Sequence, residues 1–157
     1  MSLQAAPPTR RAVFLSDGRL GSRHCHAAEL AAFLSTLRCK RLYLVGDIVD
    51  LWWMAQRRAQ WGSAQNRVVE ALHALRRAGT EIVYIPGNHD RPIRRFCGLA
   101  LPAMQVRRRA IHVTADGRRL LVVHGDEFDG RQPAATDDRA GVRRLAAHVH
   151  DRRCNHR

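Results

Sequence analysis

Lysine is almost missing from this sequence, and nothing in it marks a dedicated nucleic-acid binder. Of its 27 basic residues only Lys40 is a lysine, and the arginines are scattered through the chain rather than gathered in one stripe. The formal net charge of +13 favours an anionic substrate or surface. Neither a zinc-finger spacing nor an aromatic-rich basic motif accompanies that charge, so no specific nucleic acid is expected.

Paired cysteines and long apolar runs are also missing. The four cysteines stand alone, without a C-x-x-C pair, which indicates reduced thiols rather than disulfides or a zinc site. No apolar run approaches the roughly 20 residues that a membrane span needs, and residues 1–11 lack the apolar stretch of a secretory signal. We therefore expect a cytoplasmic protein, with peripheral contact to an anionic inner membrane left open.

Apolar strands alternate with helical segments over the larger part of the chain. The expected order is β-α-β-α-β followed by a β-hairpin: strands at 12–17, 41–47 and 81–85, helices at 27–37 and 64–78, and a hairpin pairing 110–114 with 119–123. This order predicts an α/β fold whose sheet is covered on both faces. The expected domain organisation is a disordered leader at 1–10, one domain at 11–130 and an irregular basic tail at 131–157.

Four of the expected strands end in polar residues of a kind that binds divalent ions. These residues are Asp17, Asp47, Asn88, His89, Asp90 and His124. A single aspartate after a strand could simply cap the next helix. Sites in open α/β sheets lie beyond the carboxyl ends of the strands, so the whole set can converge. Two ions bridged by one carboxylate can polarise a phosphoryl group, and a nearby histidine can assist as acid or charge stabiliser.

The same clusters carry a family resemblance. Ser16-Asp17, Gly46-Asp47-Ile48-Val49-Asp50, Gly87-Asn88-His89-Asp90 and His124-Gly125-Asp126 resemble the ordered motifs of the calcineurin-like metallophosphoesterases. The resemblance implies an αββα-type sandwich, here incomplete because the late strands are missing. The run from Leu42 to Trp52 and the hairpin leading into His124 resemble the branch of UDP-2,3-diacylglucosamine diphosphatase and its relatives. That branch cleaves the pyrophosphate of a UDP-linked acylated sugar in lipid A synthesis, usually with manganese.

The resemblance implies the metal ligands. Asp17 would bind the first ion, Asp47 would bridge both ions, and Asn88 and His124 would bind the second. The implied cofactors are two divalent ions, Mn²⁺ or alternatively Fe²⁺, Zn²⁺ or Mg²⁺. The implied partner is a phosphorylated small molecule or a UDP-sugar lipid.

The resemblance also implies the catalytic residues. His89 would face the substrate phosphate, and Asp90 would orient its ring. Asp50 would support the site rather than bind a metal ion. Trp52 and its neighbours could line a substrate pocket or pack a loop.

Two departures from the family pattern bear on activity. The first motif of the family is Asp-x-His, but here Arg19 stands in the third position, and a protonated guanidinium cannot bind a metal ion. The family also supplies two histidines from a late Gly-His-x-His motif. The nearest match here is Ala147-His148-Val149-His150, so His148 and His150 are candidate ligands if the tail is in register.

Three function classes follow from these patterns. The first is a metal-dependent phosphohydrolase. The second is a catalytically impaired remnant, truncated or degenerate at its C-terminus, that retains one ion at most. The third is a nuclease of the same superfamily or a basic nucleic-acid-binding module, which predicts a steep dependence of binding on salt.

Overall fold

A computed structural model of the chain describes residues 9–56, 59–99, 101 and 103–128. The tail expected at 131–157, with His148 and His150, lies outside the described residues, as do residues 1–8 of the expected leader. In the part of the chain that is described, no helix is long and apolar enough to cross a membrane.

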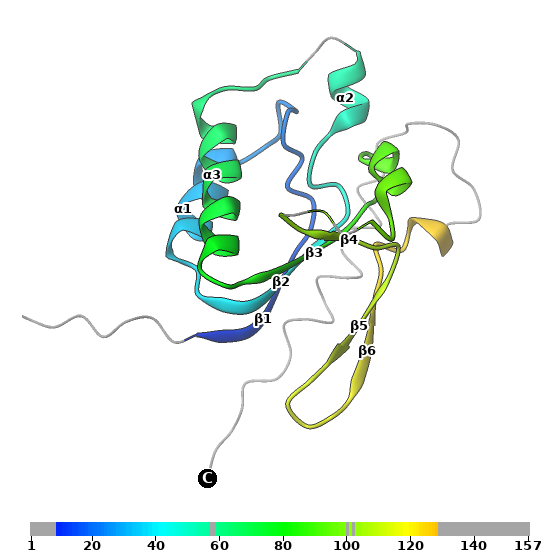
Figure 1. Cartoon of the computed structure of the whole chain (residues 1–157). Helices are drawn as coiled ribbons and strands as arrows, with labels where there is room; N and C mark the ends of the chain where they lie inside the picture. Colours follow the sequence, from blue (N-terminus) through cyan, green and yellow to red (C-terminus); the bar gives the residue numbers. More distant parts are fainter. Residues whose placement is uncertain (1–8, 57–58, 100, 102, 129–157) are drawn as a thin grey trace, which may run out of the picture. The chain divides into compact units, whose positions relative to one another are not determined.

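A parallel sheet forms the centre of the described unit. It contains β1 (Arg10–Leu15), β2 (Cys39–Val45), β3 (Glu81–Ile85) and β4 (Gln105–Val106), hydrogen-bonded in that order (Figure 1). The mixed α/β class expected from the sequence is confirmed. The strand β4 is not among the expected elements, because a strand of two residues is too short to show an alternating pattern.

Helices cover one face of this sheet. The two long ones, α1 (Ala27–Thr36) and α3 (Ser63–Arg77), lie side by side in Figure 1. Connections between parallel strands are nearly always right-handed, so a strand order that runs in one direction places both helices on the same face. Leu42 and Leu44 of β2 belong to the core on this side. The short α2 (Leu51–Ala55) follows β2 and was not predicted.

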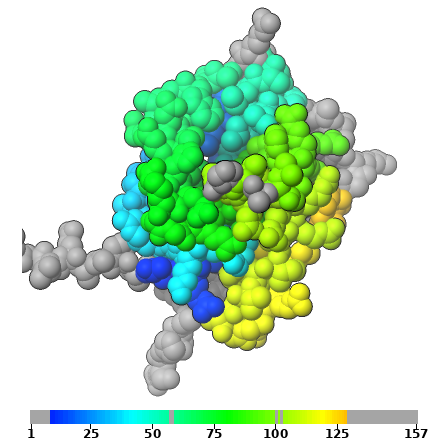
Figure 2. Space-filling view, in the orientation of Figure 1, coloured from blue at the N-terminus to red at the C-terminus, as the bar shows by residue number. Residues whose placement is uncertain are grey.

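The β-hairpin covers the other face. Its strands β5 (Ala110–Val113) and β6 (Arg119–Val122) pair in antiparallel fashion, and Val122 packs with Tyr43 and Val45 of β2. Because side chains alternate along a strand, β2 contributes residues both to the core under the helices and to the core under the hairpin. The outer side of the hairpin is exposed and shows in yellow at the surface in Figure 2.

A histidine of the hairpin lies in an aromatic contact between the two layers. The Tyr43 hydroxyl lies 3.3 Å from Nδ1 of His112. The rings of Phe14 and Tyr43 stack at 4.7 Å, and His112 meets both edge-on. Burial, with the charges of Arg41 and Arg11, lowers the pKa of His112 below its ordinary value.

The lowered pKa of His112 predicts a pH effect on stability. The unfolded chain binds a proton at this histidine more readily than the folded chain, so the free energy of unfolding falls as pH drops through about 6.5. Replacing His112 with phenylalanine keeps the ring and removes the proton, so the variant should lose less stability than the parent between about pH 8 and 5. Urea unfolding across that range measures the difference. His73→Phe, at an exposed position on α3, is the control, and an equal pH slope in all three proteins would contradict the prediction.

Candidate metal centre

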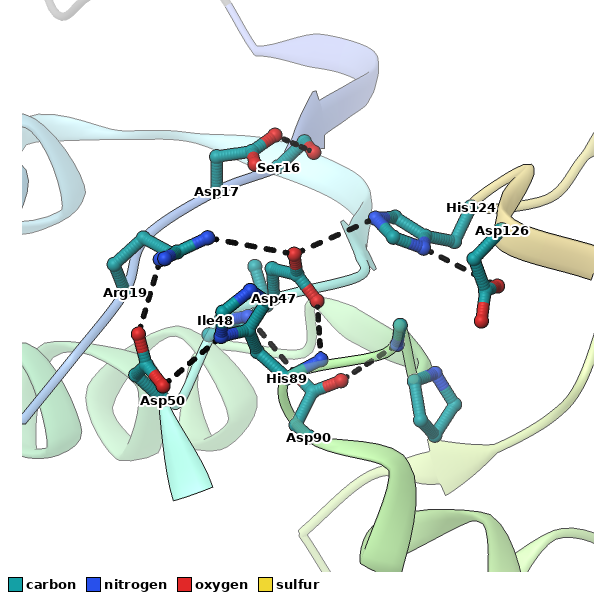
Figure 3. Close-up of polar contacts among 12 residues, drawn as sticks. Ser16, Asp17, Arg19, Asp47, Ile48, Asp50, His89, Asp90, His124 and Asp126 are labelled. Carbon is teal, nitrogen blue, oxygen red and sulfur yellow. Dashed lines mark hydrogen bonds and ion pairs between the residues drawn. The ribbon is translucent and has the colours of Figure 1, made fainter. Parts of the chain in front are cut away.

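The candidate residues lie where the strands end. Asp17 follows β1, Asp47 follows β2, the segment 87–90 follows β3, and His124 follows β6 (Figure 3). The loops after β1 and β2 are held together by their backbones. Asp17 N donates to Gly46 O at 3.2 Å, and Arg19 N donates to Asp47 O at 2.9 Å. Segments distant in the sequence therefore meet at one edge of the sheet.

The backbone is strained at this edge. Asp17, Arg19 and Asp47 all have φ near +50°, at +56°, +48° and +55°. Among the described residues they are the only ones other than glycine with positive φ. Side chains rarely adopt this left-handed conformation, which costs about 1–2 kcal/mol per residue. Such strain typically gathers at functional sites, where the fold holds a side chain in a required direction.

Asp47 is the central carboxylate of the site. It is only 4% exposed, and its Oδ1 accepts a hydrogen bond from the backbone N of His89 at 2.9 Å. Its Oδ2 lies 3.8 Å from Nε2 of His124 and 3.7 Å from Nη1 of Arg19, beyond hydrogen-bond length in both directions. Burial raises the pKa of Asp47 above its ordinary value.

His124 comes to Asp47 from the hairpin layer. Its Nδ1 lies 3.3 Å from Oδ1 of Asp126, and Arg94 in turn holds the other oxygen of Asp126. Burial acts to lower the pKa of His124, but the carboxylates of Asp126, Asp47 and Asp17 outweigh it and raise that pKa. The 3.3 Å contact is an ion-pair distance without hydrogen-bond geometry, and it places Asp126 on the Nδ1 side of the ring while Nε2 faces Asp47.

Two glycines make room for this approach. A Cβ at Gly46 would lie 1.9 Å from Cδ2 of His124, and one at Gly87 would lie 2.4 Å from Oδ1 of Asp47. No real Cβ comes so close to another atom. The two glycines therefore allow His124 and Asp47 to face each other, and Asn88 follows directly after one of them.

His89 is oriented by Asp50. Its Nδ1 lies 3.0 Å from Oδ1 of Asp50, which is 1% exposed and also accepts the backbone N–H of Trp53 at 2.9 Å as the N-cap of α2. The ring meets Trp52 edge-on at 5.9 Å. Burial acts to raise the pKa of Asp50, but His89, the Trp53 N–H and Arg19 lower it below its ordinary value. An ionised Asp50 selects the ring form that carries a proton on Nδ1.

Asp90 has other partners than the resemblance implies. It is fully buried; its Oδ2 accepts from Ile48 N at 3.0 Å and from the Tyr84 hydroxyl at 2.5 Å, and its Oδ1 accepts from Gly87 N at 2.5 Å. Asp90 thus ties the loop after β3 to the loop after β2. The contact that orients His89 comes from Asp50 instead.

These contacts predict that Asp90 contributes to the stability of the fold. Asp90→Ala leaves two buried N–H groups and a buried hydroxyl without their acceptor, so we expect the free energy of unfolding to fall by about 2–4 kcal/mol. Chemical denaturation measures the change. Glu70→Ala, at an exposed position on α3, should stay within about 0.5 kcal/mol of the parent. Equal stability of the two variants would contradict this account of Asp90.

Two of the candidate residues, Asp47 and His124, are close enough to share one divalent ion. Two bonds of about 2.0–2.2 Å can span the 3.8 Å between Asp47 Oδ2 and His124 Nε2. Asn88 offers an amide oxygen as a third donor. Considering only His, Cys, Asp and Glu, no group of three or more in the described parts of the chain could enclose an ion. The fit for one ion therefore depends on Asn88.

The residues do not fit a second ion beside Asp17. On that side of Asp47 stands the guanidinium of Arg19, with its Nε 3.1 Å from Oδ2 of Asp50. The Asp17 carboxylate accepts a hydrogen bond from the Ser16 hydroxyl. The resemblance implies an ion on each side of Asp47. The structure has a ligand pair, Asp47 and His124, on one side and the guanidinium of Arg19 on the other.

Comparison with known proteins identifies the class. The family model described as calcineurin-like phosphoesterase matches residues 23–151, which is most of the chain. The chain therefore belongs to the calcineurin-like phosphoesterase family, as its motifs indicate.

The chain also resembles individual members of the family. It is 26% identical over 121 residues to the UDP-2,3-diacylglucosamine hydrolase of Blochmanniella pennsylvanica, an alignment that covers 73% of this chain and 46% of that protein. It is 28% identical over 126 residues to the protein of the same name from Xanthomonas campestris pv. campestris strain B100, with the same two coverages. The chain thus spans about half the length of these curated relatives.

Proposed function

We propose that this chain is a metal-dependent phosphohydrolase that cleaves a phosphate ester or pyrophosphate bond. The observation that carries the proposal is the meeting of Asp47 with His124, 3.8 Å apart, beside a histidine that a buried carboxylate orients. Asp47, Asn88 and His124 would hold one divalent ion, with Mn²⁺ the proposed metal. A divalent ion held there would supply Lewis acidity, drawing negative charge from the phosphoryl oxygens.

The protein's own groups would complete the chemistry. Asp50 holds Nδ1 of His89, which leaves Nε2 to meet a phosphoryl oxygen or to give a proton to the leaving oxygen. The side chain of His89 is 17% exposed, so a substrate can reach it while bulk water is largely kept away. Arg19, 32% exposed, adds a fixed positive charge beside the same carboxylates.

For the substrate we propose a UDP-2,3-diacylglucosamine-type pyrophosphate, which would place the reaction in lipid A synthesis. The names of the relatives support this choice. The formal charge of +13 favours an anionic substrate and peripheral contact with an anionic membrane, where an acylated sugar nucleotide would lie.

Hydrolysis by the purified full chain tests the proposal. After chelation, Mn²⁺ should restore turnover of an aryl phosphodiester and of UDP-2,3-diacylglucosamine, and the latter should give the higher kcat/KM. His124→Ala should abolish this metal-dependent turnover, whereas His73→Ala, at an exposed position on α3, should retain it. Absence of turnover with Mn²⁺, Fe²⁺, Zn²⁺ and Mg²⁺ would refute the proposal.

A catalytically impaired remnant is the second candidate, and Arg19 is the observation that favours it. Its guanidinium stands 3.7 Å from the central carboxylate, on the side where the family resemblance implies a metal ion. In that case the folded chain would bind one ion at most and hydrolyse neither substrate.

A further inference from the structure

Arg19 holds an unusual place in the site. Its Nη1 lies 3.7 Å from Oδ2 of Asp47, and its Nε lies 3.1 Å from Oδ2 of Asp50. Both carboxylates are nearly fully buried, at 4% and 1% exposure. The guanidinium is thus a monovalent cation fixed between two buried anions, which is the charge environment of a metal ion.

Two further observations show that the position is built rather than incidental. Oδ2 of Asp50 is buried and, within the described residues, has no hydrogen bond of good geometry, so the charge of Arg19 is what faces it. The backbone of Arg19 has φ +48°, a conformation that is an outlier for a bulky residue. A hydrogen bond from its N to Asp47 O, at 2.9 Å, helps to hold that backbone in place.

Asp47 therefore faces a different basic side chain on each side. Oδ2 of Asp47 faces the imidazole of His124 at 3.8 Å and the guanidinium of Arg19 at 3.7 Å. Paired metal ions in phosphohydrolases stand about 3.5–4 Å apart around such a carboxylate. An ion on the Arg19 side would meet the guanidinium at contact distance, and the two positive charges would repel each other strongly.

From this geometry we propose that Arg19 takes the place of one of two metal ions, so that the chain binds a single divalent ion and presents a guanidinium to the substrate phosphoryl group. The inference rests on the proposed function for its single ion. A guanidinium can hold two phosphoryl oxygens at once and stays protonated at every working pH. The site would thus stabilise the charge of a phosphate with one Lewis acid and one hydrogen-bond donor.

Metal counting tests the inference without relying on activity. The full chain, saturated with Mn²⁺ and passed through a desalting column, should hold about one ion per molecule and give the six-line EPR spectrum of an isolated ion. Arg19→His removes the cation and adds an imidazole, a residue type that tolerates positive φ better than most. This variant should bind about two ions per molecule and give a spin-coupled spectrum.

Arg23 offers a matched control for this substitution. Arg23→His changes an exposed arginine of the same loop, whose guanidinium lies 5.6 Å from the centre of the Trp53 ring, and should leave one isolated ion. Two coupled ions in the parent would overturn the inference while leaving the proposed function in place. A parent that binds no ion would overturn both. A folded Arg19→His variant that still binds one ion would show that the guanidinium is not what excludes the second.

Discussion

Replacing His89 with glutamine should lower kcat for phosphodiester hydrolysis by about 10²- to 10⁴-fold, the usual contribution of a positioned acid or base. Asp50 holds Nδ1 of this ring at 3.0 Å, so Nε2 is the atom placed to meet the substrate. Glutamine keeps a hydrogen-bonding group of similar length but cannot give up a proton. The proposed ligands Asp47, Asn88 and His124 are unchanged, so the Mn²⁺ content of the purified variant should equal that of the parent.

Three measurements separate a catalytic role from a structural one. Steady-state kinetics should show the loss in kcat with little change in KM. Metal analysis should show full occupancy, and thermal unfolding should be close to that of the parent. His73→Gln makes the same chemical change at an exposed position and should leave all three unchanged. A His89→Gln variant that loses its ion in proportion to its activity would assign this histidine to metal binding instead.

Gly46→Ala should weaken metal binding at the proposed site. The added Cβ would lie 1.9 Å from Cδ2 of His124 and 2.4 Å from its Cγ, so the ring must leave its place beside Asp47. The variant should bind Mn²⁺ at least about 10- to 100-fold more weakly, as expected when a ligand loses its orientation. Steric overlap, together with a side chain at φ +71°, should also lower the free energy of unfolding by about 2–4 kcal/mol.

Gly79 provides the matched control for this substitution. It has φ +92°, and within the described residues a Cβ there would meet nothing within 4 Å. Gly79→Ala therefore carries the backbone strain without the clash, and should lower stability by about 1–2 kcal/mol while Mn²⁺ binding stays at the parental level. Isothermal titration and urea unfolding of both variants measure the two effects. Equal losses in both would mean that contact with His124 does not matter.

Much of the fold can be predicted from the sequence, because the apolar residues of its strands and helices recur with the periods typical of those elements. The strands β1 to β3 and the helices α1 and α3 lie within a few residues of the expected ranges. Each strand is an apolar run, and each helix carries an apolar stripe, so the pattern alone indicates the element. The elements that were missed, α2 and β4, contain five and two residues, fewer than a period needs to appear.

The site could be predicted only in part, because its contacts depend on side-chain directions. The rule that sites form at strand ends points to Asp47 and His124, which the structure places 3.8 Å apart. It cannot say which carboxylate holds His89, because that depends on side-chain directions set by tertiary packing. The place of Asp50 as an N-cap, three residues before Trp53, is a signal that could have indicated a fixed and buried carboxylate. Asp126 stands in the His124-Gly125-Asp126 motif, but nothing in the sequence pointed to its partner Arg94.

The proposed ligands come from two layers, the sheet and the hairpin, which are synthesised at different times. Asp47 stands just after β2, whereas His124 lies more than seventy residues later, after a hairpin that Val122 seats against Tyr43 and Val45. If both residues hold the ion, as we propose, a nascent chain would bind it only after the hairpin has left the ribosome, even if the sheet and its helices have already formed. Metal binding would then favour the seated hairpin over any undocked form.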